Sequence, residues 1–305
     1  MNEKIKIALG YVLITLVWGS TWLVIRIGLD SLSPMLAVGL RSLVASFFIF
    51  FIMKFAKIKL QTDPLSLKIY LLLTFFSFII PQSLVYWAEQ FVPSGLTSVI
   101  FSTFPFFIIF FSWILSSTEQ VGPYKILGSV IAFLGITIIF WNDFSFDFSL
   151  YSIGIIAILI SSGIQGFVSV IIKKHGNHLH PLSINFLPLL LSGIILIPFG
   201  YFFEDQTNFV IDSKGIYSIL YLAVLSNVIS FTVYYWLMKK ISVVILSLSS
   251  FITPVIALIL GVIILNEKIT IYHIVGSSLV LIGIIFANFK GLIKYYKEKR
   301  EYKFD

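Results

Sequence analysis

The sequence has no cysteine and little charge of either sign. Without cysteine, the chain has neither a disulfide framework nor a thiolate metal site. Charged residues make up 11% of the 305 residues, whereas soluble domains carry about 25%. A soluble protein of this length needs many more polar side chains to cover its core. These shortages exclude a soluble enzyme, a disordered chain and a nucleic-acid-binding module.

Hydrophobic residues, in contrast, are abundant. They make up 58% of the chain, aromatic residues make up 17%, and the mean hydropathy is +1.01. This composition indicates an integral membrane protein. The net charge of +7 is then explained by basic residues at the ends of membrane helices, where they set orientation. We expect the lipid bilayer and a small-molecule substrate as partners, and no nucleic acid.

Ten long apolar stretches divide the chain. A hydrocarbon core about 30 Å thick is crossed by a helix of about 20 apolar residues. The stretches that meet this length are 7–26, 34–53, 68–88, 94–117, 124–141, 150–172, 182–203, 215–237, 241–265 and 270–289. Continuous runs of this kind favour helices over a membrane barrel, and the first exceeds a signal-peptide core. The sequence therefore predicts an all-α polytopic membrane protein with ten transmembrane helices.

The basic residues predict the orientation of these spans. With the N-terminus in the cytoplasm, most of the 21 Lys and Arg residues fall in cytoplasmic segments, and the outer loops are mainly acidic. By the positive-inside rule, both termini are cytoplasmic. A basic tail, residues 291–305, then lies along the cytoplasmic leaflet. The composition favours a multi-pass protein of a prokaryotic plasma (inner) membrane.

The two halves of the chain resemble each other. Residues 128–136 resemble residues 276–284 at an offset of 148, and Pro105 matches Pro254 at an offset of 149. The ordered set of matches indicates two units of five spans, residues 1–143 and 150–290. Because five is odd, the second unit is inverted relative to the first. Inverted repeats of this kind are typical of secondary transporters, which alternate access around a midplane site.

Short motifs occur in order along the whole chain and identify a resemblance. They are Trp18-Gly19-Ser20-Thr21, Gly39-Leu40-Arg41, Ala88-Glu89-Gln90, Val92-Pro93-Ser94-Gly95, Thr103-Phe104-Pro105, Thr253-Pro254-Val255 and Leu265-Asn266-Glu267-Lys268. Together with the ten-span frame they resemble EamA-type transporters of the drug/metabolite transporter superfamily. The resemblance implies metabolite transport, often export of amino acids or related solutes, with some members handling drugs or nucleotide sugars. Residues 161–165 depart from the family pattern, which commonly has a Trp there.

Polar and aromatic side chains predict where a solute binds. They recur at helical spacing in the first, third, fourth, sixth, eighth and ninth stretches, whereas the fifth and tenth carry hardly any hydrogen-bonding group. Because polar groups in a bilayer face the protein interior or a cavity, we expect the first set to surround a cavity. Individual serines also suit helix packing. The candidate cavity residues are Trp18, Arg41, Gln82, Tyr86, Glu89, Ser102, Gln165, Asn227 and Tyr234.

Two charged residues in this set suggest the chemical class of the substrate. Arg41 is a fixed cation that would bind a substrate carboxylate, and Glu89 would bind a substrate ammonium, so the pair suits a zwitterion such as an amino acid. In the alternative interpretation, Arg41 extends to the interface and Glu89 pairs with it or lies in a solvated loop. Glu89 is also the candidate proton site, because the deep parts of the spans hold no carboxylate.

Proline and glycine indicate bending and close packing. Pro105 and Pro254 each remove a backbone hydrogen bond from the middle of a span, so we expect hinges there. Two glycines in the fifth stretch, Gly128 and Gly135, and their counterparts in the tenth allow close approach of helices. This approach occurs within one chain or between copies, so a homo-oligomer through the fifth and tenth spans is one expectation.

We predict a secondary transporter, with export as the direction, that moves small metabolites such as amino acids by alternating access. The alternatives are a multidrug or amphipathic-compound exporter and a membrane scaffold or sensor without transport. An intramembrane enzyme is not expected, because the sequence has no HExxH motif and no pair of intramembrane aspartates. The histidines of residues 175–180 have no Cys or acidic residue near them, so we expect a solvated loop, no metal and no cofactor.

Overall fold

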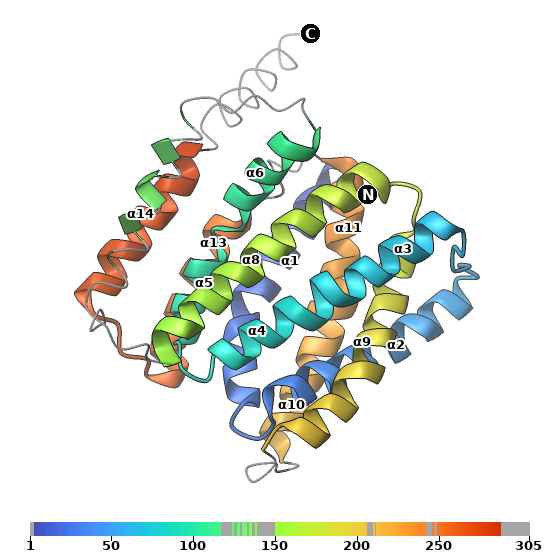
Figure 1. Ribbon diagram of the computed structural model, residues 1–305, viewed down its shortest axis with the longest axis horizontal. Helices are drawn as coiled ribbons and strands as arrows, with labels where there is room; N and C mark the ends of the chain where they lie inside the picture. The colour runs from blue at the N-terminus through green and yellow to red at the C-terminus, as the bar shows by residue number, and fades with distance from the viewer. Residues whose placement is uncertain are drawn as a thin grey trace.

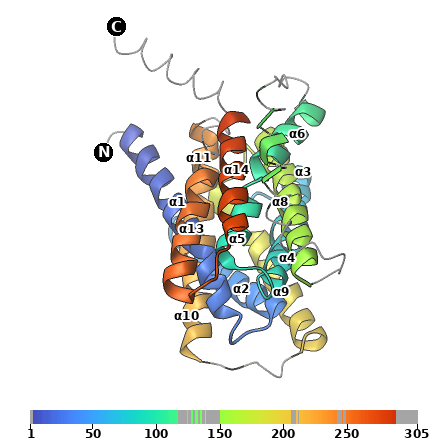
Figure 2. The ribbon, with the colours of Figure 1, turned by 90° about the vertical axis from the view of Figure 1, so that its left-hand side faces the viewer.

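The computed structural model describes residues 3–116, 150–205, 212–241 and 249–287, together with Val210, Leu246 and several positions between 124 and 138. Every regular element in these residues is a helix. Seven helical runs are long and apolar enough to cross a membrane, and two shorter apolar helices, Ile252–Leu265 and Ile271–Gly283, accompany them. The helices lie side by side in one bundle (Figures 1 and 2).

Four of the seven spans are single helices, namely α1 (Glu3–Gly28), α2 (Pro34–Phe55), α8 (Leu150–His175) and α9 (Pro181–Phe203). Three are composite. They consist of α3 (Pro64–Leu73), η1 (Thr74–Ile79) and α4 (Ile80–Ala88), of α5 (Ser94–Phe101) and α6 (Phe104–Ser116), and of α10 (Ser213–Tyr221), η2 (Leu222–Ser230) and α11 (Phe231–Lys240). Helices α13 (Ser249–Leu265) and α14 (Ile271–Ala287) complete the described bundle.

The boundaries of these seven spans lie within four residues of those predicted from hydropathy. The predicted fifth span, 124–141, lies largely outside the described residues, as do the start of the ninth and the tail 291–305. The helix starts follow from local chemistry. Pro34, Pro64 and Pro181 occupy the first turn of their helices, where a missing N–H costs nothing. The side chains of Asp63 and Asp212 accept a hydrogen bond from a backbone N–H in the first turn of α3 and α10.

Two wide turns interrupt the third and eighth predicted spans. The π-helical segments η1 and η2 begin at Thr74 and Leu222, which are 148 residues apart, the same offset as the sequence repeat. Single π turns inside α-helices often occur at functional sites. Both segments also shift the phase of the side chains that follow them, which matters for the cavity described below.

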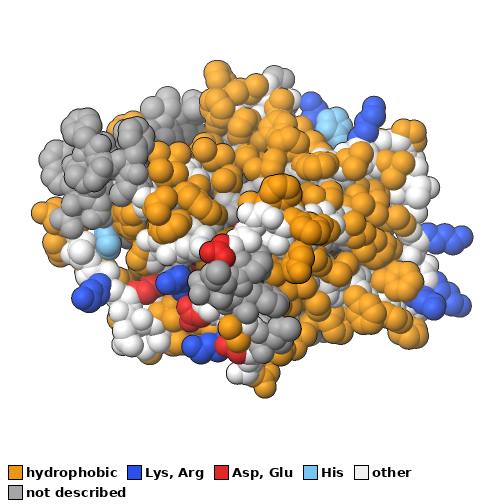
Figure 3. Space-filling model, turned by 60° about the horizontal axis from the view of Figure 1, so that its bottom comes forward, with side chains coloured by type: hydrophobic (Ala, Val, Ile, Leu, Met, Phe, Trp, Pro, Cys, Tyr) orange, Lys and Arg blue, Asp and Glu red, His pale blue; other side chains and the backbone are white. Residues whose placement is uncertain are grey.

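The outside of the bundle is apolar. Large hydrophobic side chains are exposed on several helices, with Phe55 80% exposed, Phe202 75% and Phe203 74%. Figure 3 shows hydrophobic side chains over most of the visible face, with charged side chains gathered in a few places. A soluble surface of this kind would aggregate. With the lengths of the seven spans, it identifies a multi-pass membrane protein.

Glycines bring pairs of helices into backbone contact. Helices α2 and α9 pack extensively on each other, and a Cβ at Gly193 would lie 2.9 Å from the backbone nitrogen of Leu43. A Cβ at Gly135 would lie 2.6 Å from the carbonyl oxygen of Gly276, and one at Gly283 would lie 2.5 Å from that of Gly128. The glycine faces of the fifth and tenth predicted spans therefore meet within one chain.

Candidate binding cavity

A cavity of about 140 Å³ lies between the two halves of the chain. At about 30 Å³ per water, this space holds a few waters or one compact solute. Its wall is mainly apolar and aromatic, and its aromatic side chains are Trp18, Trp22, Phe101, Phe104, Phe231, Tyr234 and Tyr235. Trp18 packs against Phe231 and Tyr234, with ring centroids 5.5 and 5.1 Å apart. The wall also contains serines, two threonines, two glutamines and one arginine.

Arg41 supplies the positive charge of the wall. It lies on α2 and is 2% exposed. Its Nη2 donates to Oε1 of Gln82 at 2.7 Å, and its guanidinium lies 4.9 Å from the centroid of the Tyr86 ring. Its Nε has no hydrogen-bond partner, and no described carboxylate lies within 4.0 Å to form an ion pair. A buried charge without a counter-ion is costly, so Arg41 is suited to bind an anion.

Glu89 is a buried carboxyl beyond the cavity wall. It follows the last residue of the third span, is 1% exposed, and neither oxygen accepts a hydrogen bond from a described residue. Burial, reinforced by the negative charge of Glu267, raises the pKa of Glu89 well above its ordinary value. The positive charges of Arg26 and Arg41 lower it by smaller amounts.

Helix α8 binds carbonyls that prolines leave free. Pro81 has no N–H to donate to the carbonyl of Ser77, and Nε2 of Gln165 donates to that carbonyl at 3.1 Å. The Ser77 hydroxyl donates to Oε1 of Gln165 at 2.8 Å. In the same way, Pro105 leaves the carbonyl of Phe101 free, and the Ser162 hydroxyl donates to it at 3.1 Å. These bonds fix α8 against the third and fourth spans on one side of the cavity.

The predicted hinge prolines differ in their surroundings. The fourth span is interrupted at Ser102 and Thr103, and Pro105 is the second residue of α6, which follows the break. The Ser102 hydroxyl donates to the carbonyl of Val99 at 2.6 Å. Pro254 lies inside the continuous helix α13. The chain is therefore interrupted just before the first proline and is helical on both sides of the second.

Six of the nine candidate residues line the cavity, and they are Trp18, Arg41, Gln82, Ser102, Gln165 and Tyr234. Tyr86, Glu89 and Asn227 are buried outside the wall. Tyr86 lies beneath Arg41, and the backbone carbonyl of Asn227 accepts a hydrogen bond from Nδ2 of Asn185 at 3.3 Å.

Among the wall residues that were not singled out from the sequence are Ser77, Phe101 and Ser226. Ser77 and Phe101 each precede a proline by four residues, which is a signal that sequence reasoning could have used. Ser226 carries no comparable signal, because it lies inside η2.

At one end of the bundle, acidic side chains join the two halves of the chain. We call this end the capped end, and it contains the α1–α2, α4–α5 and α13–α14 connections and the start of α10. Oε1 of Glu267 accepts hydrogen bonds from the backbone nitrogen and hydroxyl of Ser94 at 2.7 and 2.6 Å, and Oε2 accepts from Gly95 N at 3.2 Å. Glu204 accepts from Met35 N at 2.9 Å. In each case a carboxylate of the second half binds a helix N-terminus of the first half.

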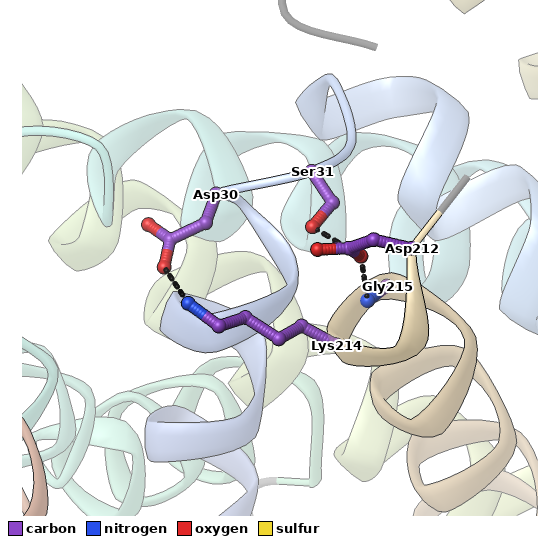
Figure 4. A network of polar contacts seen from close by, with 5 residues as sticks. All are labelled: Asp30, Ser31, Asp212, Lys214 and Gly215. Atoms are coloured by element: carbon purple, nitrogen blue, oxygen red, sulfur yellow. Dashed lines mark hydrogen bonds and ion pairs between the residues drawn. The ribbon is translucent and has the colours of Figure 1, made fainter. Parts of the chain in front are cut away.

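A third contact joins the halves at the capped end (Figure 4). The Ser31 hydroxyl donates to Oδ1 of Asp212 at 2.7 Å, and Nζ of Lys214 lies 3.8 Å from Oδ2 of Asp30. Two hydrogen bonds, from Gly215 N and from Ser31, lower the pKa of Asp212 below its ordinary value. The capped end is thus held by polar contacts between the two halves.

Comparisons with known proteins identify relatives along the whole chain. The model of the EamA-like transporter family matches residues 5–141 and 152–289. The uncharacterized transporter YoaV of Bacillus subtilis is 28% identical over 285 residues, which cover 93% of this chain and 97% of that protein. The protein PagO of Salmonella typhimurium is 29% identical over 291 residues, with coverage of 95% and 94%. One crystal structure shares the fold, with a TM-score of 0.68, 15% identity, and coverage of 93% of this chain and 96% of that chain.

Proposed function

Because the chain belongs to the EamA-like transporter family, we propose that it is a secondary transporter that exports small metabolites with a carboxylate group, amino acids and related solutes among them. The observation that carries this proposal is Arg41, a buried cation in the wall of a cavity between the two halves, to which the described residues offer no counter-ion. A substrate carboxylate would supply the missing negative charge.

Alternating access is the mechanism we propose. The cavity is lined by residues of both family matches, among them Arg41 in the first and Gln165 in the second. Two family units, π segments 148 residues apart and paired glycines in residues 128–135 and 276–283 support ten helices in two inverted repeats, residues 1–143 and 150–290. The repeats would move against each other, with Pro105 and Pro254 as hinges.

We place the protein in the plasma membrane with both termini in the cytoplasm. The excess of Lys and Arg in the corresponding loops supports this orientation. A homo-oligomer would have to use faces of the fifth and tenth spans other than their glycines, because Gly135 and Gly276 contact each other within the chain. Reporter fusions to each terminus test the orientation, and a periplasmic signal from either would contradict it.

Glu89 is the proposed proton site. Its carboxyl is buried and unpartnered, and Tyr86 on the same helix contacts Arg41. Binding of a substrate anion at Arg41 would remove a positive charge that lowers the pKa of Glu89, so anion and proton binding would favour each other. In vesicles, Glu89→Gln is expected to abolish the dependence of substrate movement on an imposed pH gradient, with Glu3→Gln, an exposed carboxylate away from the capped end, as the control. Unchanged pH dependence in Glu89→Gln would exclude this role.

Metabolite profiling of the medium tests the proposed function. Cells that express the intact protein should enrich a carboxylate-bearing solute outside, and Arg41→Gln should lose that enrichment at equal abundance in the membrane. Enrichment of amphipathic drugs instead would favour the multidrug alternative. No enrichment with the intact protein present in the membrane would contradict export.

A further inference from the structure

The unpartnered polar atoms of the cavity wall can all donate a hydrogen bond. Among the described residues that line the cavity, Trp22 Nε1, Arg41 Nε and Ser98 Oγ are buried and have no hydrogen-bond partner. A Trp Nε1–H and an Arg Nε–H can only donate, and a Ser hydroxyl can donate. Buried donors are normally paired, so a ligand that completes this wall has to offer acceptors.

The charge of the wall is positive, which agrees with a ligand that offers acceptors. Arg41 is the one Asp, Glu, Lys, Arg or His residue among the described lining residues. An ammonium group in the cavity would therefore meet a cation and no carboxylate, since Glu89 lies outside the wall. The carbonyls of Ser77 and Phe101, which prolines leave free, are already bound by side chains of α8. The wall offers neither a counter-charge nor these carbonyls to an ammonium.

The remaining wall fits an apolar body. Trp18, Trp22 and Phe101 contribute aromatic faces, and Ile25 and Val168 contribute aliphatic ones. The volume of about 140 Å³ is close to the roughly 150 Å³ of an apolar cavity that binds benzene. A ring or a branched aliphatic group would fill this space and leave the carboxylate at Arg41.

We propose that this cavity binds a monocarboxylate anion with an apolar body and discriminates against the corresponding zwitterionic amino acid. The inference rests on the proposed function and narrows its substrate class. It revises the zwitterion predicted from Arg41 and Glu89, because that ligand needs an ammonium partner at the wall.

Binding by the purified full-length protein tests the inference. The probes are 3-phenylpropanoate, phenylalanine, 3-phenylpropanamide and 2-phenylethylamine, which share a phenyl group and differ in charge. We expect Kd for 3-phenylpropanoate to be at least about tenfold lower than for the other three, since a hydrogen bond to a charged group is worth about 1.5–3 kcal/mol. Equal binding of phenylalanine, tighter binding of the amine, or no binding of any probe to folded protein would overturn the inference.

Three variants locate the site. Arg41→Gln should weaken 3-phenylpropanoate binding at least tenfold, whereas Lys54→Gln, a control at an exposed position of the same helix outside the wall, should leave it unchanged. If Arg41→Gln does not fold, Ser98→Ala removes one donor together with only one heavy atom and should weaken binding several-fold. Unchanged binding in Ser98→Ala, or displacement of the probe by chloride at equal concentration, would contradict the proposed site. Because the readout is binding, failure of transport would leave this result in place, and equal binding of phenylalanine would leave transport untouched.

Discussion

Glu267 is expected to hold the capped end closed, and replacing it with glutamine measures that contribution. The carboxylate accepts three hydrogen bonds from Ser94 and Gly95 at the start of α5. A hydrogen bond to a charged group is worth about 1 kcal/mol more than a neutral one, so three such bonds lose about 3 kcal/mol. Glu267 is partly exposed, and screening reduces this to about 2 kcal/mol. The closed state of Glu267→Gln should therefore become about 30-fold less favoured.

Thiol labelling measures this change directly, because the chain has no cysteine. A cysteine at position 98, one helical turn from Ser94 and buried in the cavity wall, reports opening. We expect Glu267→Gln to raise the rate of maleimide labelling about 30-fold. Glu3→Gln, which removes an exposed ion pair with Lys240, is the control and should change the rate less than twofold. A rate in Glu267→Gln equal to that of the control would refute the role of these hydrogen bonds.

Further predictions concern stability. Gly135→Ala should destabilise the protein by about 1–3 kcal/mol through backbone overlap, whereas Gly163→Ala, whose Cβ would make an ordinary contact at 3.4 Å, should be neutral in thermal unfolding. Gln165→Leu leaves a buried carbonyl unpaired and should cost about 1–3 kcal/mol by the same measurement. The hydrogen bond from Gly215 lowers the pKa of Asp212 below about 3.9. Ionised Asp212 therefore stabilises the folded protein above that pH, and this stabilisation is lost as the pH falls through the lowered pKa. Asp212→Asn should flatten this acid limb, and an unchanged limb would contradict it.

Much of the fold could be predicted from the sequence, because hydropathy and proline mark helix positions directly. The seven described spans have nearly the predicted boundaries, and the predicted stretch 34–53 starts at Pro34, where α2 begins. Arg41, the most isolated charge in a predicted span, indeed lies in the cavity wall.

The misplaced cavity residues have physical reasons. A regular 3.6-residue period aligns Asn227 with Tyr234, but Asn227 lies inside the π segment η2, which shifts the phase of the side chains. Ser226 therefore faces the cavity, and Asn227 contacts Asn185. Local sequence carries no signal for such a wide turn. Glu89 is predicted to line the cavity, with a solvated loop as the alternative, but it is buried outside the wall, and this burial depends on distant residues near Glu267 that no local pattern reveals.

Counterflow in proteoliposomes tests the central claim, that the Arg41 cavity moves a monocarboxylate across the membrane. Vesicles loaded with unlabelled 3-phenylpropanoate should accumulate the labelled anion from outside when they contain the intact protein or Lys54→Gln. With Arg41→Gln, at least 90% of this accumulation should be lost, a change of about tenfold. Equal accumulation with Arg41→Gln, or none with the intact protein, would contradict the claim.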